Sequence, residues 1–138
     1  MRTTCLTLLL VVSLAAGAGE WRVSDADSFG WRRALIAVGG DRLAIVCPPD
    51  AAPFAVPVAD AALADGGGRF SLGLQIDGER HDQAMVCSDV LCEAELSQAA
   101  WQALVRGERV TLWVDDWRGP TFPLDGSATA LRACSPDY

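Results

Sequence analysis

The sequence predicts a mainly β (α+β) fold: an antiparallel, β-sandwich-like single domain with one packed amphipathic helix, a short C-terminal helix and two disulfides. Apolar runs of strand length alternate with glycine- and proline-containing turns along most of the chain, which is typical of antiparallel sheets. One clear stretch, residues 97–106, repeats its apolar side chains at the 3–4 spacing of a helix. Four cysteines follow residue 18, an even set that is typical of an exported, disulfide-stabilised domain.

Residues 1–18 are expected to be a signal peptide. The chain starts with a positive residue, Arg2, and continues with an apolar run from Leu6 to Ala16 and small residues up to Ala18. The run is shorter than the ~20 residues that span a bilayer, so a retained membrane anchor is the less favoured alternative. We therefore expect cleavage after Ala18, one β-rich domain over residues 19–138, and a periplasmic or secreted location.

The first strands are predicted by three stretches near the start of this domain. Trp21 to Val23 is typical of a short first strand. Trp31–Val38 and Arg42–Cys47 are apolar runs joined by Gly39-Gly40-Asp41, a hairpin signal because glycine accepts the positive φ of tight turns. These stretches predict one short strand followed by a hairpin.

The middle of the chain contains an irregular stretch and then a second hairpin. Four prolines exclude a regular helix over the first half of residues 48–66, and Val58–Asp65 fits either one or two helical turns or an irregular strand. Phe70–Ile76 alternates apolar and small or polar residues, which predicts a half-buried strand. After the turn signal Asp77-Gly78, a more polar return strand over Arg80–Cys87 is expected to be an outer strand.

The predicted helix runs from Ser97 to Arg106. Ser97 is expected to cap its first N–H groups, and Gly107 to end it in the left-handed conformation. Its apolar face comprises Leu96, Ala100, Trp101, Leu104 and Val105.

The end of the chain predicts a third hairpin and a last helix. Glu108–Asp115 is expected to be a strand, Asp116–Pro120 a turn, and Thr121–Leu124 the partner strand. Ser127 is then expected to cap a short helix over Ala128–Ala133, which leads to the last cysteine.

Four cysteines allow three disulfide pairings. We favour Cys87–Cys92, which is local, and Cys47–Cys134, which ties an early strand to the C-terminal region. A metal site formed by Cys87, Cys92 and His81 is a weaker alternative, because the two-residue cysteine spacing of zinc knuckles is missing. A redox-active Cys87/Cys92 pair is a further alternative, although CSDVLC is longer than the usual CxxC motif.

No catalytic constellation is apparent in the sequence. His81 is the one histidine, no GxSxG-like nucleophile accompanies it, and we interpret it as a solvated strand residue. The carboxylate pairs Asp115-Asp116 and Glu93/Glu95 have no further signature of acid–base chemistry. Phosphate loops, dinucleotide fingerprints and calcium loops are missing as well. The sequence therefore predicts neither an enzyme nor a bound cofactor.

The charge balance disfavours several classes of partner. Beyond residue 18 the chain has ten basic residues, all of them arginine, and eighteen acidic residues, a balance of −8. Such a surface repels phosphate backbones and anionic lipid heads, so nucleic-acid binding and peripheral membrane binding are not expected.

The tryptophans provide the candidate interaction surface. Trp113 and Trp117 flank a predicted β-turn that also contains Arg118, and tryptophan and arginine dominate binding hot spots. The alternative is that each tryptophan fills the core of a small domain, which is how we interpret Trp101. Trp117 is the one that we expect to be exposed.

The patterns CSDVLCEAEL, LVRGERVTLWV and FPLDGSATAL lie within residues 85–131. They resemble the C-terminal half of the invasion-associated locus B family. The tryptophan near the mature start, the strand ending in Cys47 and the final helix with Cys134 are also similar to an envelope accessory family associated with type VI secretion. The chain departs from the first family in its short, proline-rich middle and in Cys134. The resemblance implies an exported, β-rich bacterial envelope protein without an established enzymatic activity, and it provides no catalytic residue.

These observations predict an exported periplasmic or envelope accessory protein that binds other envelope proteins and has no integral membrane segment after signal cleavage. Two alternatives remain open. One is a thiol–disulfide redox protein that uses Cys87 and Cys92. The other is an acidic inhibitor of a cationic hydrolase, which the charge balance would suit.

Overall fold

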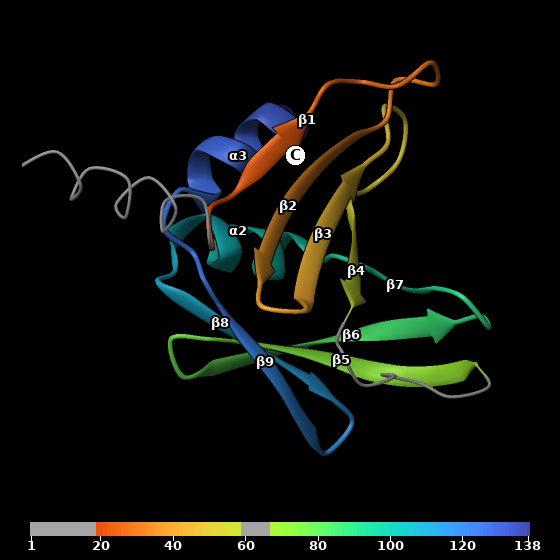
Figure 1. The fold of residues 1–138 in the computed structure, drawn as a ribbon, viewed down its shortest axis with the longest axis vertical. Coiled ribbons are helices and arrows are strands. Elements are labelled where there is room, and N and C mark those ends of the chain that lie inside the picture. The colour runs from red at the N-terminus through yellow and green to blue at the C-terminus, as the bar shows by residue number, and fades with distance from the viewer. Residues whose placement is uncertain (1–18, 59–66) are drawn as a thin grey trace, which may run out of the picture.

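The computed structural model describes residues 19–58 and 67–138 (Figure 1). Within them, nine strands form one antiparallel sheet in the order β1-β2-β3-β4-β7-β6-β5-β8-β9. The strands are β1 (Arg22–Ser24), β2 (Arg32–Val38), β3 (Asp41–Cys47), β4 (Phe54–Val58), β5 (Gly68–Ile76), β6 (Glu79–Cys87), β7 (Cys92–Glu95), β8 (Arg109–Val114) and β9 (Trp117–Pro123). The helices are α2 (Gln98–Arg106) and α3 (Ser127–Cys134). The predicted signal peptide, and all of Val58–Asp65 except its first residue, lie outside the described residues.

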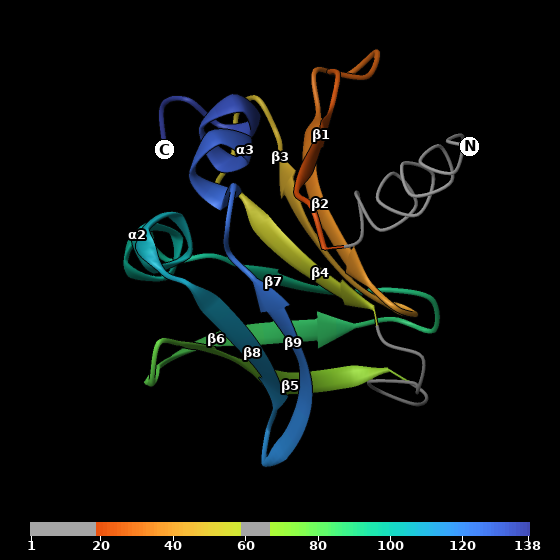
Figure 2. The ribbon, with the colours of Figure 1, turned by 60° about the vertical axis from the view of Figure 1, so that its left-hand side comes forward.

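The sheet curls around a single core, so that its two ends approach each other. Figure 2 shows strands β2 to β4 steeply inclined to β5 and β6, with α2 and α3 on one side of the molecule. The indole Nε1 of Trp21, next to β1, donates a hydrogen bond of 2.9 Å to the carbonyl of Pro123 in β9. These strands stand at opposite ends of the sheet order. A mostly β, antiparallel fold with two helices and two disulfides is therefore confirmed.

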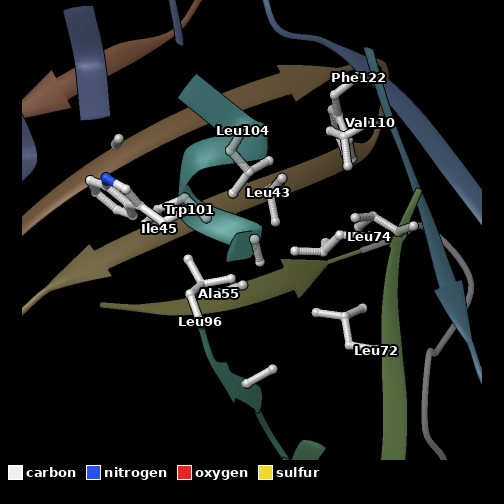
Figure 3. Close-up of a cluster of buried hydrophobic side chains, with 14 of the residues drawn as sticks. Leu43, Ile45, Ala55, Leu72, Leu74, Leu96, Trp101, Leu104, Val110 and Phe122 are labelled. Atoms are coloured by element: carbon white, nitrogen blue, oxygen red, sulfur yellow. The ribbon is translucent and has the colours of Figure 1, made fainter. Parts of the chain in front are cut away.

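One cluster of apolar side chains joins both halves of the sheet to the helices. Figure 3 shows Trp101 and Leu104 projecting from α2 toward Leu43 and Ile45 of β3. All four side chains are buried, which confirms the interpretation of Trp101 as a core residue. None of the helices among the described residues is long and apolar enough to cross a membrane.

The expected outer position of the strand after Asp77-Gly78 is wrong, because β6 lies inside the sheet. It pairs with β5 along one side and with β7 along the other. Its polarity comes from one face: Arg80 and Asp82 are exposed, whereas Gln83 and Met85 on the opposite face are buried. An antiparallel strand can be interior and still present one face to water, so polarity alone does not mark an edge.

Two short strands are absent from the sequence-based prediction. β4 contains Pro57, and β7 has four residues directly after the cysteine loop. The β4–β7 ladder joins Phe54 and Ala55 to Glu95 and Ala94, so it stops before Pro57. Pro57 has no N–H to donate, and it lies beyond the part of β4 that forms hydrogen bonds with β7.

The predicted cap of α2 is confirmed at its N-terminus and corrected at its C-terminus. Ser97 is its N-cap, as predicted, and the Ser97 hydroxyl oxygen accepts a hydrogen bond of 3.1 Å from the N–H of Ala100. Gly107 ends the helix, but its φ of −78° is not left-handed, so that part of the prediction is wrong. A Cβ at this position would meet the side chain of Ile76, and it would lie 2.9 Å from the carbonyl oxygen of Ala103. Close packing, rather than a positive φ, therefore excludes a side chain at Gly107.

The predicted cap of the last helix is also corrected. Gly126, with φ of 86°, is the N-cap of α3, and Ser127 is the first helical residue. The buried Ser127 hydroxyl donates instead to the carbonyl of Leu104 at 2.7 Å. Because Leu104 lies in the last turn of α2, its carbonyl has no partner within that helix. Ser127 thus joins the two helices.

Candidate functional site

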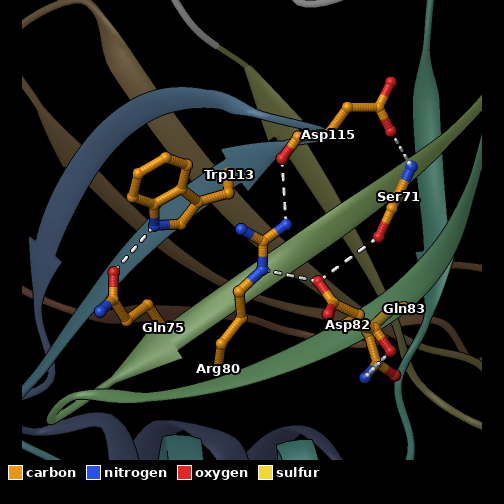
Figure 4. Close-up of polar contacts among 7 residues, drawn as sticks. All are labelled: Ser71, Gln75, Arg80, Asp82, Gln83, Trp113 and Asp115. Carbon is orange, nitrogen blue, oxygen red and sulfur yellow. Dashed lines mark hydrogen bonds and ion pairs between the residues drawn. The ribbon is translucent and has the colours of Figure 1, made fainter.

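The predicted interaction residue Trp113 lies on the outer face of β5, β6 and β8, in a polar network (Figure 4). Its indole Nε1 donates to Gln75 Oε1 at 2.8 Å, and the guanidinium carbon of Arg80 lies 5.4 Å from the ring centre. Arg80 Nε in turn donates to Asp82 Oδ1 at 2.7 Å, and Arg80 Nη2 donates to the backbone carbonyl of Asp115 at 3.0 Å. These bonds fix the orientation of the half-buried indole.

Arg80 reaches Trp113 by crossing β5 at Gly73. In the sheet, Gly73 stands between Asp82 of β6 and Trp113 of β8. A Cβ at Gly73 would lie 2.5 Å from Arg80 Nε and 2.8 Å from Arg80 Cζ. The guanidinium therefore occupies the space of the missing side chain. Sequence reasoning missed this contact, because it depends on the register of β5 and β6 with β8, which follows them in the chain only after β7 and α2.

The turn between β8 and β9 is shorter than predicted. Strand β9 begins at Trp117, so the turn consists of Asp115 and Asp116, and the expected turn over Asp116–Pro120 is wrong. Asp115 has φ of 51°, which allows this short reversal, and Asp115 Oδ1 accepts a hydrogen bond of 2.9 Å from the N–H of Ser71. This carboxylate therefore ties the turn to β5.

Trp117 and Arg118 lie at the start of a terminal strand. The Trp117 side chain is 48% exposed, which confirms the expectation for this residue, and Arg118 is exposed opposite Trp113 in the β8–β9 ladder. The Arg118 side chain makes no hydrogen bond or ion pair with another described residue. Because β9 is last in the sheet order, one backbone edge of this strand has no strand partner among the described residues. The structure thus brings Arg118 beside Trp113 on the outer face, whereas Trp117 stands opposite the buried Val114 and projects from the other face of β9.

A polar groove of about 710 Å³ adjoins this surface. Arg109 and Arg118 line it together with Gln75, Asp77 and Glu108. The Asp77 carboxylate accepts hydrogen bonds from the backbone N–H groups of Glu108 and Arg109, at 3.0 and 3.3 Å. The Asp77 carboxylate thus holds the start of β8, and Arg109 and Arg118 contribute positive charge to the lining of the groove.

His81 is placed differently from the expectation of a solvated strand residue. It pairs with the buried Leu74 on the inner face of β6, it is half-buried, and its Nε2 is buried without a hydrogen-bond partner among the described residues. Asp82, its neighbour in sequence, points to the outer face and bonds to Arg80. The structure therefore does not bring His81 and Asp82 together as a catalytic pair.

The four cysteines form the two favoured bridges, Cys47–Cys134 and Cys87–Cys92. The first ties the end of β3 to the end of α3. The second joins residues that face each other across the β6–β7 ladder. Because the sulfurs of Cys87 and Cys92 are bonded to each other, they are not free metal ligands. Across residues 19–58 and 67–138, no three His, Cys, Asp or Glu side chains are grouped so as to hold a metal ion.

Asp27 organises the loop that carries Trp31. Asp27 Oδ1 accepts hydrogen bonds from the backbone N–H groups of Phe29, at 2.9 Å, and Trp31, at 3.0 Å. The bond from Trp31 is the main cause that lowers the pKa of the Asp27 carboxyl, with smaller contributions from Phe29 and the charge of Arg33. Trp31 in turn packs edge-on against Phe54, with ring centres 6.0 Å apart.

The geometry of the terminal strand suits recognition: the fixed indole of Trp113 and the guanidinium of Arg118 lie on its outer face, and the exposed indole of Trp117 lies on its other face, along an open strand edge. Comparisons with protein-family models, with curated proteins and with solved structures found no match for this chain.

Proposed function

We propose that the protein is an exported envelope accessory protein that binds another envelope protein through Trp113, Trp117 and Arg118. The exposure of Trp117 and Arg118 on the two faces of the open edge strand β9 is the observation that carries this proposal. The role is also the one implied by the resemblance to the invasion-associated locus B family.

Tryptophan and arginine at this position are suited to protein binding. An indole buries a large apolar area on contact, and a guanidinium donates several hydrogen bonds in a fixed geometry. Trp113 is already held by Gln75 and Arg80, so little side-chain freedom is lost when a partner covers it. The edge of β9 adds unpaired backbone groups that an extended segment can bond.

The compartment belongs to the same proposal. Two disulfides in a domain of this size suit an oxidising environment, and the expected signal peptide provides the route.

The test is affinity capture from envelope extracts with the double variant Trp117→Ala/Arg118→Ala. The partner recovered with the unaltered protein is expected to be lost, because truncation of such residues typically weakens an interface by about 2 kcal/mol or more per hot spot. The matched control is Phe29→Ala/Arg132→Ala, which removes an exposed aromatic and an exposed arginine elsewhere. Equal recovery with the test variant and the unaltered protein would show that this surface is not the binding site.

A further inference from the structure

A second surface lies on the outer face of β4, β7 and β6, which β5 and β8 separate from β9 in the sheet. It is a hollow of about 530 Å³ with mainly apolar walls. Its lining includes Trp31, Phe54, Ala84, Val86, Glu93 and Glu95. We refer to it as the β7 groove.

Two carboxylates run along the floor of the β7 groove. Glu95 stands opposite Phe54 of β4, and Glu93 stands opposite Val86 of β6, so each glutamate has an apolar neighbour beside it. As residues two apart in one strand, Glu93 and Glu95 project from the same face, roughly 7 Å apart along the strand. Both are exposed, and neither side chain bonds to another described residue. Arg69 of β5 stands opposite Val86 of β6, so it lies on the side of β6 away from β7. It makes no ion pair with either glutamate.

The aromatic wall of the β7 groove is fixed in place. Trp31 meets Phe54 edge-on, at an angle of 79° between the rings. The backbone of Trp31 is held by Asp27, through the N–H bond described above and through a second bond from the N–H of Asp27 to the carbonyl of Trp31 at 3.0 Å. A rigid wall of this kind keeps its shape without a ligand.

The β6–β7 hairpin extends the groove into an exposed apolar tip. Val86 is 56% exposed, Val90 90% and Leu91 43%. The Cys87–Cys92 disulfide closes this tip, and the N–H of Ser88 donates to the carbonyl of Leu91 at 2.8 Å. The bridge thus holds in a fixed position the side chains of Val90 and Leu91, which contribute little to the core.

We infer that the β7 groove and the Val90–Leu91 tip together bind a cationic, apolar segment of a partner protein. The arginine or lysine side chains of the segment lie between Glu93 and Glu95, and their aliphatic stems pack against Phe54 and Val86. Apolar side chains of the same segment cover Val90 and Leu91. The disulfide has a binding role here: it fixes the tip before the partner arrives.

Charge and shape both select this class of partner. The two exposed carboxylates attract a positive side chain, and apolar walls strengthen that attraction by reducing the contact with water. Long basic side chains suit such a groove, because their methylene stems cover apolar surface while the charged group reaches the carboxylate. An anionic segment would be repelled by Glu93, Glu95 and the overall balance of −8 beyond residue 18.

The probe for this inference is a synthetic nine-residue peptide that alternates leucine and arginine, with a fluorescent label. Fluorescence anisotropy with the oxidised protein is expected to show saturable binding, and no binding of the matched leucine–glutamate peptide. Glu93→Gln/Glu95→Gln is expected to weaken binding at least tenfold. Glu20→Gln/Glu79→Gln removes the same charge from exposed positions outside the groove and is expected to change the affinity less than twofold.

Two further variants test separately the apolar tip and the proposed binding residues Trp113, Trp117 and Arg118, which we refer to as the β9 surface. Cys87→Ser/Cys92→Ser, with the Cys47–Cys134 bridge intact, is expected to weaken binding several-fold while the near-ultraviolet circular dichroism of the core is retained. Trp117→Ala/Arg118→Ala is expected to bind the peptide normally, so failure of the β9 surface and failure of the groove are distinguishable.

Three results would overturn the inference. The first is equal affinity of Glu93→Gln/Glu95→Gln and the unaltered protein. The second is equal affinity for a serine–arginine peptide, because binding would then depend on net charge alone. The third is self-association, seen in light scattering, that Glu93→Gln/Glu95→Gln abolishes, because the occupant would then be a second copy of the chain.

Discussion

Asp27 sets the conformation of the loop before β2 through a single carboxylate oxygen. Its pKa is lowered from the ordinary value of 3.8, chiefly by the hydrogen bond from the N–H of Trp31. A carboxyl whose pKa is lower in the folded than in the unfolded state stabilises the fold at pH values above its unfolded pKa. This contribution to stability is lost as the pH falls through the folded pKa. We therefore expect the Trp31 amide resonance to titrate below pH 3.8, as the loop loosens. Asp27→Asn, which retains one carbonyl acceptor, is expected to remove the titration and keep the loop. A Trp31 amide that titrates at or above 3.8 would contradict this account.

Gly107 is needed for space rather than for its backbone angles. A Cβ there would press on Ile76, the carbonyl of Ala103 and Leu124. We expect Gly107→Ala to lower the free energy of unfolding by about 2–3 kcal/mol in urea titrations, as overpacking does. Gly126→Ala, at φ of 86° with nothing within 4 Å, is expected to lower it by about 1 kcal/mol. A neutral Gly107→Ala would disprove the close approach.

At the residue scale, the sequence predicted roles that depend on neighbours in the chain and missed those that depend on register. The cap at Ser97 follows from the residues beside it. Gly73 looks like any glycine in a strand, and its role appears only when Arg80 and Trp113 are placed on either side. Ser127 likewise fits a cap by position, but its partner, Leu104, belongs to another helix.

One buried hydroxyl links α2 to α3 in addition to their apolar packing. Ser127→Ala leaves the Leu104 carbonyl buried without this donor, and we expect a loss of about 1–3 kcal/mol in the free energy of unfolding. Thr129→Ala, at an exposed position of α3, is the matched control and is expected to change the stability by less than about 0.5 kcal/mol. Equal effects of the two substitutions would contradict a specific bond at Ser127.

Elements with a strong internal pattern were predicted well, and short elements were not. The hairpins at Gly39-Gly40 and Asp77-Gly78 and the amphipathic helix all follow from periodicity and turn chemistry. β7 has four residues with acidic side chains on one face, too few for a period to show. The polarity of β6 predicted an edge strand, because a sequence does not reveal which strands flank a particular strand in the sheet.

The two disulfides act on very different lengths of chain. Cys47–Cys134 spans a sequence separation of 87 residues and Cys87–Cys92 one of 5. From loop entropy, removal of the long bridge as Cys47→Ser/Cys134→Ser is expected to lower the free energy of unfolding by roughly 4–5 kcal/mol, and removal of the short bridge by about 2 kcal/mol. Urea unfolding of both serine pairs measures this difference. A short-bridge variant that is less stable than the long-bridge variant would contradict the account.

For the whole molecule, the sequence predicted the β-rich class and the pairing of the cysteines but not the curl of the sheet. The curl brings together Trp21 and Pro123, two residues 102 positions apart, a contact that no local pattern marks. The candidate surface was predicted in part, because Trp117 is exposed as expected, whereas the network around Trp113 required the order of β5, β6 and β8.

The central claim is that the β9 surface contacts another envelope protein. Its most direct test is a photo-crosslinking amino acid at position 117 of the full chain in living cells, with position 29, which is 79% exposed, as the control. We expect light to produce one discrete adduct from position 117 and none from position 29, and we expect Arg118→Ala to weaken the adduct. No adduct from position 117, or the same adduct from both positions, would contradict the claim.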